Sequence, residues 1–116
     1  MDVEKNFFKE VNFAITVCDK NGEIIYMNDK SCQTFLKPGR EALIGKNVLD
    51  CHPEPAHSLL ADMLQNPRTN AYTIEKNGIK KLIYQTPWYV EKEYMGFMEL
   101  SMEIPFDMKH MVRSKE

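Results

Sequence analysis

A chain of 116 residues, 43% hydrophobic and 28% charged, is long enough to bury one apolar core and has the composition of a folded domain. Its formal net charge of −2 and the absence of a clustered basic face argue against a nucleic-acid partner. No run of apolar residues approaches the length of a membrane span, and the opening MDVEKNFFKE lacks the layout of a signal peptide, so we expect no membrane segment and a cytoplasmic location.

The three cysteines, Cys18, Cys32 and Cys51, are odd in number and show no CxxC spacing. This pattern argues against a disulfide scaffold and against a zinc ribbon. It also excludes covalent haem attachment through a CxxCH motif. A reducing compartment therefore fits the cysteine content best.

The chain opens with an amphipathic pattern over residues 2–11, in which Val3, Phe7 and Val11 recur every four positions and predict a helix. Two short runs, FAITVCD and EIIYMN, then lie on either side of an Asn-Gly pair. Because Asn-Gly is the strongest short hairpin signal, these runs predict two paired antiparallel strands.

The middle of the chain is expected to form short helical pieces. DKSCQTFLK predicts a helix, which Pro38 and Gly39 end because they cannot continue it. REALIGKNVLD predicts a broken helical connection with Ala42, Leu43 and Ile44 facing inward.

The last third predicts three strands, two of them in NAYTIEKNGIKKLIYQTPWY around a second Asn-Gly pair and the third in YMGFMELSMEIP. Alternation along the third strand places Glu99, Ser101 and Glu103 on one face, which we expect to be at least partly wet. The opposite face, expected to be buried, carries Gly96, Met98, Leu100, Met102 and Ile104. Two β blocks with helices between them indicate an α+β domain, an antiparallel sheet with its helices on one face.

The order of these elements resembles that of a PAS domain. In that family a strand runs into Asp-x-x-Gly, an apolar strand ends in Tyr-x-Asn, and a helix and a Gly-Lys element follow. The matching landmarks in FAITVCDKNGEIIYMND and LIGKNV are Asp19, Gly22, Tyr26, Asn28, Gly45 and Lys46. The resemblance implies a five-stranded antiparallel sheet of order 2-1-5-4-3, with short helices over one face.

The resemblance covers roughly residues 12–104, which we take as the domain. Residues 1–11 would be a leading amphipathic helix and residues 105–116 a polar tail. A narrower likeness is to PAS-like modules that carry a Cys-His-Pro step and accompany hemerythrin-like domains in bacterial proteins. The flavin-photosensor motif Asn-Cys-Arg-Phe-Leu-Gln is missing, so a flavin adduct is not expected.

The stretch CHPEPAHSLLADML reads first as the opening of a helix. Pro55 suits the first helical turn, where its missing N–H removes no hydrogen bond. Leu60 and Met63 lie in the apolar stripe of this helix, which runs through about Leu64 and closes before an Asn-Pro pair.

The same stretch has two other interpretations that involve Cys51 and His52. A structural zinc would need four ligands, and adjacent residues seldom both reach one ion, so we expect no metal site. A thiol beside a histidine near a helix start has reasons for a lowered pKa and hence for redox reactivity. The alternative is a buried and inert cysteine.

Haem is the third interpretation. In haem-sensing PAS domains a histidine on the helix facing the sheet holds the iron, and His57 lies on the corresponding helix. Met95, Met98 or Met102 would then supply a distal ligand or a soft wall. An ordinary boundary histidine is the alternative, and the cofactor, if there is one, stays unassigned.

Eight methionines suggest an adaptable apolar pocket between helix and sheet, or loose core filling. The expected pocket residues are Cys51, His52, His57, Leu60, Met63, Tyr84, Met98, Leu100 and Met102. The leading helix would pack on the outer sheet face, pair with its counterpart in a dimer, or cap its own domain. The expected dimer-interface residues are Val3, Phe7, Val11 and Phe97.

These features predict a non-catalytic sensory module, since no nucleophile-base arrangement is legible. It would bind a small molecule and pass the signal to a partner signalling protein or a fused effector domain, and we expect a homodimer. The alternatives are a haem-binding redox or gas sensor that uses His57, and a pure dimerisation module with a filled core.

Overall fold

Tight turns join most of the strands that follow one another in the chain, and helices lie between the second strand and the third. The computed structural model describes residues 3–35 and 43–114. β1 (Ala14–Asp19) and β2 (Ile24–Met27) are joined by a turn in which the Asp19 carboxylate accepts hydrogen bonds from the amides of Asn21 and Glu23, at 2.9 and 3.0 Å. This side chain-to-backbone pattern is typical of aspartate in turns.

The other two hairpins have shorter, two-residue loops. β3 (Asn70–Lys76) and β4 (Ile79–Val90) meet at Asn77 and Gly78, both with positive φ, as a hairpin turn with two left-handed residues requires. β4 and β5 (Glu93–Ile104) meet at Glu91 and Lys92, which also have positive φ. The predicted Asn-Gly hairpins are therefore confirmed.

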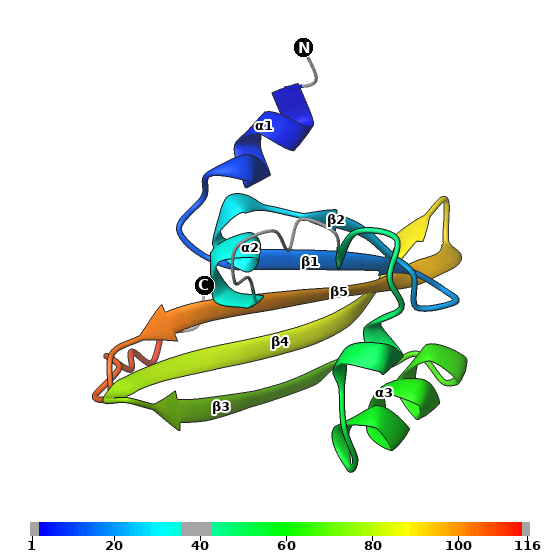
Figure 1. Ribbon diagram of the computed structural model, residues 1–116. Helices are drawn as coiled ribbons and strands as arrows, with labels where there is room; N and C mark the ends of the chain where they lie inside the picture. The colour runs from blue at the N-terminus through cyan, green and yellow to red at the C-terminus, as the bar shows by residue number, and fades with distance from the viewer. Residues whose placement is uncertain (1–2, 36–42, 115–116) are drawn as a thin grey trace.

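The strands form one antiparallel sheet of order β2-β1-β5-β4-β3 (Figure 1). This is the predicted order. It places the last strand between the first and the fourth, so β5 is the central strand of the sheet.

The helices are short. α1 is Val3–Lys9 and α2 is Asp29–Phe35, while a 3-10 helix, η2, is Val48–Cys51 and α3 is Ala56–Gln65. α3 begins directly after Pro55 and ends before Asn66, close to the predicted bounds. In the described ranges no helix has the length and apolarity to cross a membrane.

Helices α2, η2 and α3 gather on one face of the sheet, here called the helix face, which includes Cys18 of β1 and Phe97 of β5 (Figure 1). Cys18 and Phe97 are cross-strand partners and belong to one buried cluster with residues of β2, η2 and α3. The other members of that cluster are Ile24, Met27, Val48, Leu60, Met63 and Leu64.

The expected orientation of β5 is wrong. Because side chains alternate along a strand, the residues on the helix face with Phe97 are Glu99, Ser101 and Glu103. The predicted inward residues Met98, Leu100 and Met102 therefore lie on the opposite, outer face, where they pair with Thr86, Tyr84 and Leu82 of β4.

The connection before η2 agrees with expectation only in part. Leu43 packs against the core cluster, whereas Ile44 is 51% exposed and does not face inward. Ala42, Pro38 and Gly39 lie outside the described residues.

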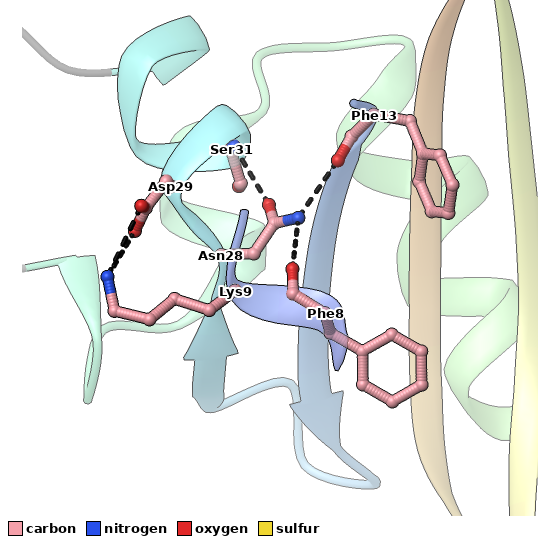
Figure 2. Close-up of polar contacts among 6 residues, drawn as sticks. All are labelled: Phe8, Lys9, Phe13, Asn28, Asp29 and Ser31. Atoms are coloured by element: carbon pink, nitrogen blue, oxygen red, sulfur yellow. Dashed lines mark hydrogen bonds and ion pairs between the residues drawn. The ribbon is translucent and has the colours of Figure 1, made fainter. Parts of the chain in front are cut away.

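α1 points away from the sheet and does not lie on its outer face (Figure 1). Asn28, at the end of β2, ties it to the domain by donating to the carbonyls of Phe8 and Phe13, at 2.8 and 2.9 Å (Figure 2). A salt bridge of 2.9 Å between Lys9 and Asp29 adds a second link.

Candidate ligand-binding site

A cavity of about 300 Å³ lies between η2 and the helix face of the sheet. Its apolar lining comes from β1, β2, β5, η2 and the connection before η2: Cys18, Ile24, Met27, Leu43, Val48, Phe97 and Met98. Its polar lining is Thr16, Asp50, His52, Gln85 and Glu99. An apolar hollow with a few placed polar groups is the usual form of a small-molecule site.

A second hollow of about 330 Å³ adjoins the first, between α3 and the β3–β4 hairpin. His52 and Gln85 border both hollows, so the two are neighbours on the helix face. Leu60 and Met63 of α3 line the second hollow, opposite Tyr72 of β3. The site thus extends from β1 across the sheet to β3.

The polar residues of the helix face form a chain of hydrogen bonds across three strands. The side-chain nitrogen Nδ2 of Asn70 donates to Oε1 of Gln85 at 3.0 Å. Nε2 of Gln85 in turn donates to a carboxylate oxygen of Glu99 at 2.8 Å. A carboxylate only accepts, so Gln85 must present its amide nitrogen to Glu99, and Asn70 must then donate to Gln85. The chain therefore ends on a negative charge at the cavity.

A hydrogen bond to η2 fixes the imidazole ring of His52. Its Nδ1 lies 2.7 Å from the carbonyl oxygen of Val48. A carbonyl oxygen accepts hydrogen bonds and does not donate them, so Nδ1 carries the proton in this contact. In the neutral ring, Nε2 is then left as an acceptor.

Two other side chains at the site have pKa values displaced by burial. Burial raises the pKa of the Cys18 thiol, so this lining residue is a protonated and unreactive core cysteine. Burial and then the negative charge of Glu99 raise the pKa of Tyr72, which keeps the phenol neutral. Both groups therefore favour the protonated form, which is not the nucleophilic one.

Hydrogen bonds also fix the framework around the cavity. The hydroxyls of Thr16 and Ser31 lie 2.6 Å apart and link β1 to α2. The Tyr94 hydroxyl donates to the Leu64 carbonyl at 3.0 Å, which ties the end of α3 to β5. The elements that bound the site are therefore held to the sheet at separate points.

Four of the expected pocket residues border the hollows: His52, Leu60, Met63 and Met98. Met98 borders the cavity next to Phe97 although the alternation of β5 places it on the outer face with Leu100. Tyr84, Leu100 and Met102 do not, because the strand register places them on the outer face. Tyr84 is 39% exposed there.

The two remaining pocket candidates lie near the site. Cys51 is the last residue of η2, and its side chain lies outside the described part of the chain. His57 is half-buried on α3 and lines neither hollow.

The residues that form the polar chain, Asn70, Gln85 and Glu99, were missed in the sequence. The signal was present, because Glu99 alternates with apolar residues in the longest predicted strand. Because polar residues usually face water, the pattern alone favours the wet face for Glu99.

The expected dimer-interface residues are not brought together. Phe97 is 4% exposed and belongs to the core, so its assignment to an interface was wrong. Phe7 is 66% exposed on α1, and Val11 is half-buried in the segment that follows. The side chain of Val3 lies outside the described residues.

The chemistry of the site favours binding. Among the side chains that the structure describes, no group of three or more from histidine, cysteine, aspartate or glutamate converges as a metal-ligand set. A haem held through His57 does not fit this arrangement, because that ring lines neither hollow.

Comparison with known proteins gives a family and a fold. The sequence model of the PAS domain family matches residues 12–87. A search of curated proteins found no significant match.

Solved structures superimpose on most of the chain. The C-terminal domain of a Streptococcus mutans protein has a TM-score of 0.69 at 17% identity, over 89% of this chain and 85% of its own. The PAS domain of Bordetella pertussis BvgS has a TM-score of 0.67 at 18% identity, over 91% and 87%. A sensory box sensor histidine kinase from Vibrio cholerae has a TM-score of 0.61 at 15% identity, over 90% and 91%. At these identities the similarity shows a shared fold and no more.

Proposed function

The chain belongs to the PAS domain family, and we propose that it is a non-catalytic sensory module that binds a small, mostly apolar molecule. The observation that carries this proposal is the cavity of about 300 Å³ on the helix face, with an apolar lining and a fixed chain of polar side chains. A pure dimerisation module with a filled core would not contain a cavity of this kind.

The elements around the cavity suggest how binding would be passed on. A ligand there would contact β1, β5 and η2 at once, and would alter how η2 packs on the sheet. His52 links η2 to the second hollow beside α3. We propose that this shift in packing changes the surface seen by a partner signalling protein or a fused effector domain.

We further propose that the module acts as a homodimer through α1. Phe7 and Phe8 are both exposed on this helix, and α1 points away from its own sheet (Figure 1). Two adjacent exposed aromatic side chains are available to pack against a second copy.

Calorimetric titration with phenethyl alcohol, a neutral aromatic probe, tests the binding proposal. Leu43 lines the cavity, so Leu43→Trp would place a larger side chain in it and should weaken binding about tenfold or more. Ile44→Trp is the matched control, because the neighbouring Ile44 is exposed and lines no part of the cavity. Equal binding by both variants, or no saturable binding by the unmodified chain, would contradict the proposal.

A further inference from the structure

We propose that the cavity selects a ligand with a cationic, hydrogen-bond-donating head, such as an ammonium group, on an apolar body. This inference rests on the proposed binding function, and it names the chemical class of the ligand. Glu99 would receive the head, and the apolar lining around Phe97 and Met27 would hold the body.

The first step is the fixed direction of the polar chain. Gln85 donates to Glu99 and accepts from Asn70, so its amide cannot reverse without bringing two oxygens together. One oxygen of Glu99 receives Gln85, and each carboxylate oxygen has more than one acceptor position. The carboxylate thus retains capacity to accept from a ligand at the cavity wall.

The second step is that the remaining polar groups also favour a donor. His52 uses Nδ1 to donate to Val48, which leaves Nε2 as an acceptor in the neutral ring. Asp50 adds a second carboxylate at the border of the cavity. Among the lining residues that the structure describes, a ligand donor therefore has several acceptors available, whereas a ligand acceptor has few donors.

The third step concerns charge. Among the described residues that line the two hollows there is no lysine or arginine. Among these described lining residues, a carboxylate or phosphate ligand would meet the carboxylates of Glu99 and Asp50 and no lysine or arginine, and like charges at close range oppose binding. An ammonium head would instead form a charge-assisted hydrogen bond with Glu99.

Three probes with the same phenethyl body test the inference on the intact chain. They are phenethylamine, which is cationic at neutral pH, phenethyl alcohol, which is neutral, and hydrocinnamate, which is anionic. Calorimetry or nitrogen-edited NMR titration should show phenethylamine binding about tenfold or more tightly than hydrocinnamate.

Glu99→Gln keeps the shape of the side chain and removes its charge, so it should reduce this preference to about threefold or less while phenethyl alcohol still binds. Glu103→Gln is the matched control. It makes the same change on the same face of β5, at a residue that borders neither hollow. It should leave the preference unchanged.

The outcomes separate the two proposals. If phenethyl alcohol binds but phenethylamine has no advantage over hydrocinnamate, the ligand class is wrong and the binding function stands. If none of the three probes binds, both proposals are wrong. An unchanged preference in Glu99→Gln would overturn the role of Glu99, and the comparison of probes on the unmodified chain holds even if that variant fails to fold.

Discussion

Asn28 uses all of its hydrogen-bonding capacity at the junction of three elements. It is 1% exposed, and its amide nitrogen donates to two carbonyls, of Phe8 and Phe13 (Figure 2). Its side-chain oxygen accepts from the amides of Ile15 and Ser31 at 2.9 and 3.0 Å. One side chain thus joins the α1 end, β1 and the start of α2.

Asn28→Ala should destabilise the fold by about 3 kcal/mol, because it leaves several buried backbone groups without partners. Urea unfolding monitored by circular dichroism measures the change. Asn66→Ala is the control, since Asn66 makes an exposed hydrogen bond with Asp62 and its loss should cost about 0.5 kcal/mol or less. Equal losses in the two variants would contradict the role given to Asn28.

Gly96 is required where β5 crosses close to β1. Its φ is +155°, and a Cβ at this position would overlap the carbonyl oxygen of Cys18. The indole nitrogen of Trp88, the cross-strand partner of Gly96, donates to that same carbonyl at 3.0 Å. The absence of a side chain lets the two strands and the indole meet.

Gly96→Ala should therefore cost more than about 3 kcal/mol or prevent folding, since the overlap is with backbone. Gly78→Ala offers a comparison, because Gly78 also has positive φ but faces open space. That change should cost about 1 kcal/mol from backbone conformation alone. Thermal unfolding of both variants distinguishes them, and similar melting temperatures would rule out the steric argument.

At the scale of the element, the start of α3 depends on a carboxylate before its first turn. The Glu54 carboxylate accepts from the backbone amide of Ser58 at 2.8 Å and also binds the Ser58 hydroxyl. These hydrogen bonds hold the pKa of Glu54 below its usual value. The folded state thus favours the charged form of this residue.

Because the pKa of Glu54 is lowered on folding, its contribution to stability is present above the pKa it has in the unfolded chain. That contribution is lost as the pH falls through the lower, folded value. NMR titration of the Glu54 side chain should show the depressed pKa, and Ser58→Ala should bring it back toward normal. A pKa that stays depressed in Ser58→Ala would contradict this cause.

Local signals in the sequence were enough to predict most elements. The Asn-Gly pairs at the first and second hairpins, Pro55 before α3 and the alternation in β5 each report on a few neighbouring residues. The strand order came from resemblance to the PAS family. The side of β5 that faces the helices could not be read in the same way, because alternation defines two faces but not which is covered.

The inward position of Glu99 follows from tertiary structure. Phe97 enters the core as the partner of Cys18, and the alternation then carries Glu99 to the same side. There, Gln85 satisfies the carboxylate from the adjacent strand. A half-buried polar group with such a partner is common at binding sites, but the partner is known only once the strands are paired.

At the scale of the whole molecule, α1 has exposed aromatic side chains that its own domain does not cover. Phe7 is 66% exposed, and the helix projects beyond the sheet (Figure 1). If α1 pairs with a second copy, Phe7→Glu should shift the mass in light scattering from twice 13.6 kDa toward a single chain. Phe106→Glu is the control, since Phe106 is exposed in the segment after β5. A monomeric unmodified chain would contradict the dimer.

The measurement that tests the central claim most directly is a nitrogen-edited NMR titration with phenethyl alcohol that maps where the probe binds. The account predicts saturable shifts at the amides of Thr16, Val48 and Phe97, which surround the cavity. Shifts that gather at Leu82 and Leu100 on the outer face, or no shifts at all, would contradict it.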